Sequence, residues 1–269
     1  MKIRFHQLPT FWCSVFPTTT GDTSFVSLLR GNDNTFAAPV TFESHVVYYI
    51  RSGTMLQYLF TNPFEFVIWA AALLVAVTVH EFAHAWTADR LGDPTARLAG
   101  RVTFNPLAHL DPIGTLMLLL FRFGWGKPVP MDPFNLRNPR RDAAVISFAG
   151  PAANLTLATI FSVFIRISHL FLGSTSILIE TVLLPLIFLS IMLAIFNLIP
   201  IHPLDGGKVL VGLLPREHAY KVDAVLKQYG FIILIFLIFP FFGFSPIIAI
   251  ISPIINLILT ILLPGTPLV

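Results

Sequence analysis

The feature that most limits what this chain can fold into is a series of long apolar stretches without charged side chains. The longest are Ala143–Ile165, with 23 residues, Thr181–Ile201, with 21, and Tyr229–Leu263, with 35. A helix rises about 1.5 Å per residue and the hydrocarbon core of a bilayer is about 30 Å thick, so each of the first two can cross a membrane once. Only 12% of the residues are charged, about half of the share in soluble domains. The sequence therefore predicts an all-α polytopic membrane protein.

The other apolar stretches differ in length. Phe64–Ala88 is long enough to span the membrane, and its polar residues lie in its last turns. Tyr229–Leu263 would measure roughly 50 Å as one straight helix. Two prolines and a glycine within Pro240–Pro246 therefore favour a hairpin of two short spans. Ile113–Phe121 has only nine residues and fits a re-entrant or interfacial segment better than a span.

Residues 1–62 have a different composition, rich in Ser, Thr and Asn, with a turn signal at Gly31–Asn34. We predict a poorly structured extension there. Its basic, acid-poor composition suggests the hypothesis of a targeting extension, and a true start at Met55 is the other hypothesis. The single cysteine, Cys13, can form neither an internal disulfide nor a thiolate metal site. Any metal would need His, Asp or Glu ligands.

Lysines and arginines predict the orientation of the spans. Residues 89–142 carry eight of them and residues 202–228 carry four, whereas residues 173–180 carry none. Cytoplasmic loops are enriched in these residues, so both rich loops should be cytoplasmic, on the side where the polar residues gather. The same loops account for the net charge of +3, and the chain has no clustered basic helix. We therefore expect no nucleic-acid partner.

The sequence His80-Glu81-Phe82-Ala83-His84 lies in the last turns of the first span. At about 100° per residue, both imidazoles of such a motif can reach one ion while the glutamate flanks it. The motif alone is a weak signal. Within a bilayer, however, each ionisable residue costs at least about 2.5 kcal/mol, so three of them together need a partner. The alternative is that these residues simply end a juxtamembrane helix.

A zinc site with two histidines needs a third protein ligand and, when it is catalytic, an open fourth position. Asp205 is the best candidate for that ligand. It follows Pro200 and Pro203, which break the third long span. Gly206 and Gly207 come next and permit backbone conformations that aim the carboxylate inward. The alternative, which this segment alone favours, is a turn in which Asp205 bonds its own backbone.

Three motifs follow one another on three successive spans. They are His80–His84 (His-Glu-x-x-His), Gly150–Asn154 (Gly-Pro-x-x-Asn) and Asn197–Gly207 (Asn-x-x-Pro-x-x-Pro-Leu-Asp-Gly-Gly). Together they resemble the site-2 protease family of intramembrane zinc metalloproteases, in its compact bacterial form without a PDZ domain. The resemblance runs from about Phe64 to Leu214. It implies a three-helix metalloprotease core at 63–214, between the extension at 1–62 and a C-terminal transmembrane hairpin at 215–269.

The resemblance also implies the roles of individual residues. His80, His84 and Asp205 would bind one Zn²⁺ per chain, and Glu81 would be the general base. Zinc with such ligands acidifies water toward pH 7, and Glu81 could take the proton and pass it to the leaving amine. Asn197 matches a family asparagine close to the metal. Its amide would either donate to the developing oxyanion or satisfy the broken helix.

Four other polar residues are expected to have structural roles. Asn154 should form an interhelical hydrogen bond, and His109 should bond within its loop. His202 would be an ordinary loop histidine, with a proton shuttle beside the metal as the alternative. Arg166 should extend toward lipid headgroups.

The chain is therefore expected to be a metalloendopeptidase that cleaves a peptide bond within or near a transmembrane helix of a membrane-protein substrate. Its expected location is the cell membrane, with a bacterial plasma membrane as the first expectation, and its active site would face the cytoplasm. The alternatives are a membrane metal-ion transporter, because His and Asp on broken helices also form ion pathways, and a catalytically idle binding protein. The lipid bilayer and a transmembrane protein or peptide are the expected partners. Nothing in the sequence favours one substrate, cleavage site, regulator or oligomeric state.

Overall fold

The computed structural model describes residues 59–121, 124–172, 176–239 and 245–263. These residues form helices, and one isolated antiparallel bridge pairs Leu110 with Gly126. In chain order the helices are α4 (Pro63–Arg90), α5 (Thr95–Leu98), η1 (Pro106–Ala108), α6 (Pro112–Phe121), η2 (Pro133–Asn135), α7 (Pro139–Leu172), α8 (Ile177–Asn197), α9 (Asp205–Leu213), α10 (Arg216–Ile238) and α11 (Pro246–Leu262). The predicted all-α class is confirmed. Cys13, Met55 and nearly all of the N-terminal extension lie outside the described residues.

Three of these helices, α4, α7 and α8, are long and apolar enough to cross a membrane. Large apolar side chains such as Ile160, Val163 and Phe164 are exposed along α7, as expected of a surface in contact with lipid. The chain is thus a membrane protein, as predicted. Helix α8 ends at Asn197 rather than at the predicted Ile201, because residues 198–204, with their two prolines, form turns.

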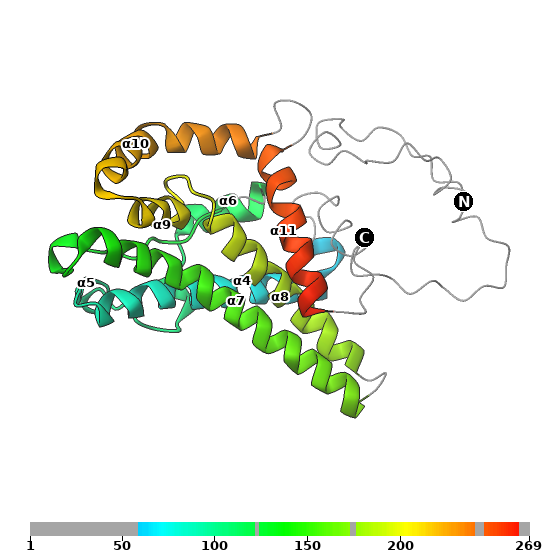
Figure 1. Cartoon of the computed structure of the whole chain (residues 1–269). Helices are drawn as coiled ribbons and strands as arrows, with labels where there is room; N and C mark the ends of the chain where they lie inside the picture. Colours follow the sequence, from blue (N-terminus) through cyan, green and yellow to red (C-terminus); the bar gives the residue numbers. More distant parts are fainter. Residues whose placement is uncertain (1–58, 122–123, 173–175, 240–244, 264–269) are drawn as a thin grey trace, which may run out of the picture.

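The spans pack closely along small residues. Ala72 and Ala76 of α4 are buried with Trp69 against Leu186 and Leu189 of α8. Small side chains allow helices to approach closely where the membrane offers no hydrophobic driving force. Figure 1 shows α7 as a diagonal running the length of the molecule, with α4 and α8 beside it and α9 and α10 near its first residues.

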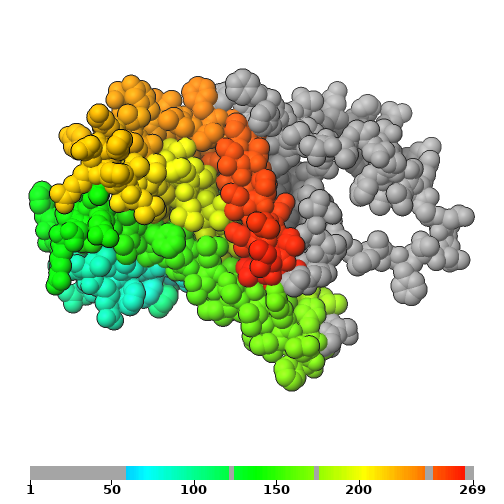
Figure 2. Space-filling view, in the orientation of Figure 1, coloured from blue at the N-terminus to red at the C-terminus, as the bar shows by residue number. Residues whose placement is uncertain are grey.

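The other side of α8 is covered by α11. Ile187 and Ile191 of α8 form one buried cluster with Ile251 and Ile255 of α11. Helix α11 lies on the surface in the space-filling view, over α7 and α8 (Figure 2). Arg166 of α7 donates to the carbonyls of Ile261 and Leu262 at the end of α11, instead of extending toward headgroups.

The C-terminal hairpin remains a prediction. Helix α11 is apolar but has 17 residues, and α10 begins with a charged half from Arg216 to Lys227. The two helices contact each other, and Pro246 begins α11. Pro240 and Gly243 lie outside the described residues.

Helix α4 ends in a motif that fixes the following loop. Gly92 has φ +107°, and the N–H of Asp93 donates to the carbonyl of Ala88, which is the bond of a Schellman cap. Asp93 is fully buried, and its carboxylate accepts hydrogen bonds from Thr95, from the N–H of Asp132 and from the amide of Asn135. Residues 93–95 and 132–135 are therefore held together at the end of the helix that carries the two histidines.

Candidate metal centre

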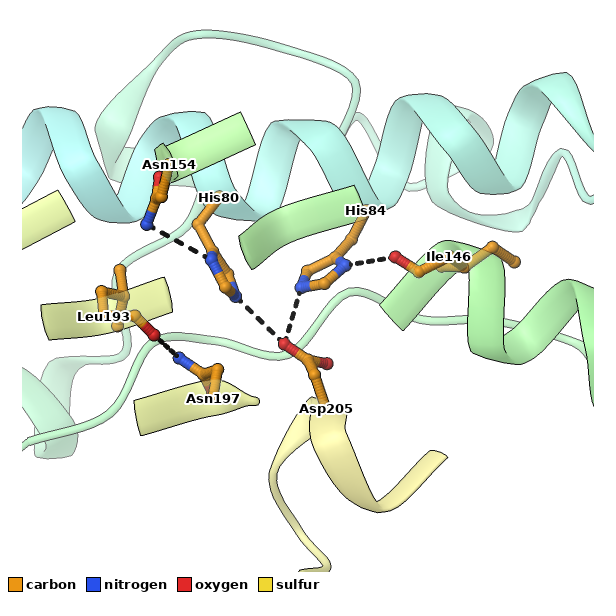
Figure 3. Close-up of polar contacts among 7 residues, drawn as sticks. All are labelled: His80, His84, Ile146, Asn154, Leu193, Asn197 and Asp205. Carbon is orange, nitrogen blue, oxygen red and sulfur yellow. Dashed lines mark hydrogen bonds and ion pairs between the residues drawn. The ribbon is translucent and has the colours of Figure 1, made fainter. Parts of the chain in front are cut away.

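The three predicted metal ligands converge at one point. His80 Nε2 and His84 Nε2 each lie 3.1 Å from Oδ2 of Asp205 (Figure 3). The ligand atoms all lie within 4.8 Å of one another, and no other group of three such side chains meets this condition in the described part of the chain. The turn alternative for Asp205 does not account for this contact between segments far apart in the sequence.

Two helices supply these ligands. His80 and His84 are buried on successive turns of α4, with their ring planes at 87° and their centroids 4.6 Å apart. Asp205 is the first residue of α9. A Cβ on Gly206 would lie 2.3 Å from the carbonyl oxygen of Leu198, so a close approach of α9 to the end of α8 requires glycine there. We expected Gly206 and Gly207 to allow unusual backbone conformations. Among the described glycines, however, positive φ occurs only at Gly92 and Gly100, so glycine is needed at 206 for space and not for its φ.

The spacing of the ligand atoms fits a zinc ion. Tetrahedral zinc with bonds of about 2.0–2.2 Å separates its ligand atoms by about 3.3–3.5 Å, close to the 3.1 Å between Asp205 and each imidazole. Burial raises the pKa of Asp205, but hydrogen bonds donated by protonated Nε2 atoms of His80 and His84 lower it. A zinc ion would take the place of these two protons and bind the same carboxylate in its ionised form.

Helix α7 orients both imidazoles. Nδ1 of His84 donates to the carbonyl of Ile146 over 2.7 Å, which leaves Nε2 with a lone pair for the metal. Nδ1 of His80 lies 3.4 Å from the amide nitrogen of Asn154, whose Oδ1 is buried without a hydrogen-bond partner among the described residues. Rotating this amide by 180° would place Oδ1 at the His80 Nδ1–H, the tautomer that leaves Nε2 for a metal. The predicted interhelical contact of Asn154 is thus a contact to a proposed metal ligand.

Gly150 lies between these two contacts. A Cβ on Gly150 would be 2.5 Å from Cε1 and Nε2 of His84 and 2.8 Å from Cε1 of His80. Ile146, Gly150 and Asn154 are four residues apart, so they share one face of α7, opposite the face of α4 that carries both histidines. The glycine leaves the space that the imidazoles fill.

Glu81 is half-buried beside this group. Its Oε1 lies 3.7 Å from the position that a Cβ on Gly126 would take. Gly126 pairs with Leu110 in the isolated bridge, within the non-helical residues 124–130, and the Lys127 N–H donates to the carbonyl of His109 over 2.8 Å. The buried guanidinium of Arg101 donates to the carbonyls of Lys127 and Pro128 and holds the segment in place.

Asn197 ends α8, and its amide donates to the carbonyl of Leu193 over 2.9 Å (Figure 3). This bond gives the amide a partner within its own helix, and the oxyanion role stays a prediction. His202 pairs with Asp223 of α10 rather than with the metal ligands. His109 bonds within its loop to the carbonyl of Thr103, as predicted.

Sequence reasoning missed two contributors to the site. The carbonyl of Ile146 carries no side-chain signal, and the sequence offers Gly150 only as part of the Gly150–Asn154 motif. The position of Gly150 four residues before Asn154 was the available signal, because that spacing puts both on the face that meets the histidines.

Comparison with known proteins also indicates a zinc metalloprotease. Peptidase family M50 matches residues 68–172 and 165–238. YwhC of Bacillus subtilis, assigned by name as a zinc metalloprotease, is 37% identical over 169 residues, or 61% of this chain and 77% of that protein. Rip2 of Mycolicibacterium smegmatis, named in the same way, is 31% identical over 204 residues, or 74% and 76%. Zinc metalloprotease MJ0392 of Methanocaldococcus jannaschii is 26% identical over 178 residues, or 63% and 43%. No solved structure matches the chain significantly.

Proposed function

The chain belongs to peptidase family M50 and is a zinc metalloprotease, and we propose that it cleaves a peptide bond within or near a transmembrane helix of a membrane-protein substrate. One observation carries this proposal. The histidines of the metal centre lie on α4, a helix long and apolar enough to span the bilayer. A peptide bond that reaches them has to lie in or near the hydrocarbon. The family match supports a protease rather than the transporter alternative.

His80, His84 and Asp205 are the proposed zinc ligands. Bound there, Zn²⁺ would supply the Lewis acidity that activates water for attack on a peptide carbonyl. Ile146 and Asn154 hold the two imidazoles with Nε2 turned toward the ligand group. The chain's own contribution is thus an oriented ligand set that needs little rearrangement on binding.

Glu81 is the proposed general base. Its carboxylate is adjacent in sequence to His80, half-buried, and forms no hydrogen bond with another described residue, so it can accept a proton from the attacking water. The same carboxyl group would then donate that proton to the leaving amine. Asn197 stays a proposed oxyanion donor, which would require its amide to leave the carbonyl of Leu193.

The non-helical segment at 124–130 is the proposed guide for the substrate. A helix resists hydrolysis because its carbonyls are hydrogen-bonded, so the substrate has to unwind locally. An unwound stretch can pair with an extended backbone by strand addition. The segment is fixed by Arg101 and His109, and its Gly126 lies close to the carboxylate of Glu81.

The proposed location is the cell membrane, with the metal centre toward the cytoplasm. Support comes from the lysines and arginines at 89–142 and 202–228, which flank the ends of the spans nearest to the metal centre.

The function is tested with the full chain in proteoliposomes and a panel of single-span substrates. Wild type and Glu81→Gln are compared for cleavage, and bound zinc is measured in both. We expect both to hold zinc and only wild type to cleave, with a loss of at least about a hundredfold in the variant. Equal cleavage by both would contradict the role of Glu81. Zinc flux without cleavage would favour the transporter.

The substrate guide is tested separately. Val129→Pro removes one backbone donor from the segment, and Val129→Ala is the matched control. The proline variant should lose cleavage while keeping zinc, and the alanine variant should keep both. Unchanged cleavage in Val129→Pro would rule out strand addition at this position.

A further inference from the structure

A second polar site lies apart from the metal centre, where α7 begins. A cavity of about 340 Å³ opens between the first turn of α7, the end of α9 and the first turns of α10. This volume lies within the range of small-molecule pockets. Figure 1 shows the beginning of α7 beside α9 and α10 on the left of the molecule. Its lining includes three arginines: Arg140, Arg141 and Arg216.

The three guanidinium groups are not neutralised by acidic residues. None of them forms an ion pair with another described residue. Nη1 of Arg140 donates to the carbonyl of Leu214 over 2.7 Å, which fixes this side chain at the wall and leaves its other N–H groups free to bind. Like charges around one cavity repel one another, and a bound anion would relieve that repulsion.

Two acidic residues at or beside the cavity, Asp223 and Asp142, already have partners. Asp223 lines it, but its carboxylate is 2.6 Å from Nζ of Lys227 and 3.2 Å from Nε2 of His202. Asp142 accepts the N–H of Asn138 over 2.8 Å at the start of α7. The positive charge of the arginines therefore dominates the cavity.

The sequence around the cavity indicates a position near the level of lipid headgroups. Arg140 and Arg141 come just before the uncharged stretch Ala143–Ile165, separated from it only by Asp142. Charged residues at the end of a span lie at the interface between hydrocarbon and water. Basic pockets between helices at this level bind the phosphates of anionic lipids.

We propose that this cavity binds a phosphate-bearing anion. Guanidinium groups match the geometry of phosphate oxygens and bind them with paired hydrogen bonds. The side chains of Asn138 and Tyr220, which also line the cavity, add neutral donors. The anion is either the headgroup of an acidic phospholipid or a soluble phosphate. In either case it joins α7 to α10, and this role is separate from the protease reaction.

The test measures binding to the purified full-length chain by native mass spectrometry. Dioleoylphosphatidylglycerol and dioleoylphosphatidylcholine are added at equal concentrations, and inorganic phosphate is titrated in a separate arm. The variant is Arg141→Gln with Arg216→Gln. The matched control is Arg137→Gln, an exposed arginine that does not line the cavity. A second variant, with both arginines changed to lysine, keeps the charge.

Retention of phosphatidylglycerol over phosphatidylcholine should fall about tenfold in the double glutamine variant and stay unchanged in the control. The lysine variant should retain part of the preference. Binding of inorganic phosphate without a lipid preference, lost in the same glutamine variant, would support the site with a soluble source. Equal retention in wild type and the glutamine variant in both arms would overturn the proposal, and so would an equal loss in Arg137→Gln. Protease activity enters none of these readouts, so this proposal can fail independently of the proposed function.

Discussion

Gly150 and His84 are in contact across the interface of α7 and α4, and the contact admits no side chain on the glycine. A methyl group there would lie 2.5 Å from Nε2, the atom that His84 presents to the metal. Real Cβ atoms essentially never approach a neighbour so closely. The imidazole positions therefore depend on a residue that contributes no ligand atom.

Gly150→Ala should lower zinc affinity about tenfold to a hundredfold, because the new methyl group displaces both imidazoles. The measurement is bound zinc per chain against a competing chelator. Val145→Ala, at an exposed position of the same helix, is the control and should bind zinc like wild type. Normal zinc affinity in Gly150→Ala would mean that α7 shifts at little cost.

Asn154→Ala should also weaken zinc binding, by about tenfold, because Nδ1 of the buried His80 loses its partner. Asn154→Asp keeps an oxygen acceptor at this position and should recover most of the affinity. A merely structural role would show the same loss in both variants. Zinc titration of the two variants distinguishes these outcomes.

Removal of zinc should loosen α9 before the rest of the molecule. The ligands on α4 and the ligand on α9 lie more than a hundred positions apart in the chain, so a bound ion cross-links two segments that are distant in sequence. A ligand present at a hundred times its Kd stabilises the bound state by about 2.7 kcal/mol. Hydrogen exchange after chelation should rise in residues 205–213 and stay unchanged in α11. A uniform rise along the chain would contradict this local link.

Asp93 should make the loop at 93–135 sensitive to acid. Burial alone would raise its pKa, but hydrogen bonds from Thr95, Asn135 and Asp132 outweigh burial and lower the pKa below its ordinary value of 3.8. A lowered pKa in the folded state means that the unfolded state binds the proton first as the pH falls. The stabilisation is therefore complete only well above pH 3.8, and it is lost as the pH falls below 3.8 toward the lower pKa of the folded state.

Proteolytic sensitivity of this loop, measured between pH 3 and 6, checks the prediction. Asp93→Asn should raise the sensitivity at pH 6 by an amount equivalent to about 2 kcal/mol, because a charged acceptor is replaced by a neutral one. Its sensitivity should also vary less with pH. Asp132→Asn, at a partly exposed position in the same loop, serves as the comparison.

The sequence predicted the spans well because absence of charge over 20 residues has few explanations besides a bilayer. It predicted the pairing of His80 with His84 from helix periodicity alone. Asp205 required the family resemblance, since an Asp-Gly segment alone favours a turn. The structure supplied the missing information, which is the approach of α9 to the end of α8 through Gly206.

Contacts between distant segments could not be predicted in this way. The carbonyl of Ile146 is chemically like every other carbonyl of α7, and its role depends on how α7 lies against α4. The same holds for Arg141 and Arg216, which are far apart in sequence and meet at one cavity. Side-chain type predicts chemistry, but the relative position of two helices is a property of the packed molecule.

The alignment of α7 with α4 has a consequence for how a substrate gains access. A register shift of α7 by one residue would move Ile146, Gly150 and Asn154 about 100° around the helix axis, away from the histidines, and would break both imidazole contacts at once. These two helices thus behave as the fixed frame of the enzyme. For the proposed transmembrane substrate, we therefore expect access through displacement of elements outside this frame, such as α6 or α11, with the proposed metal ligands kept in place.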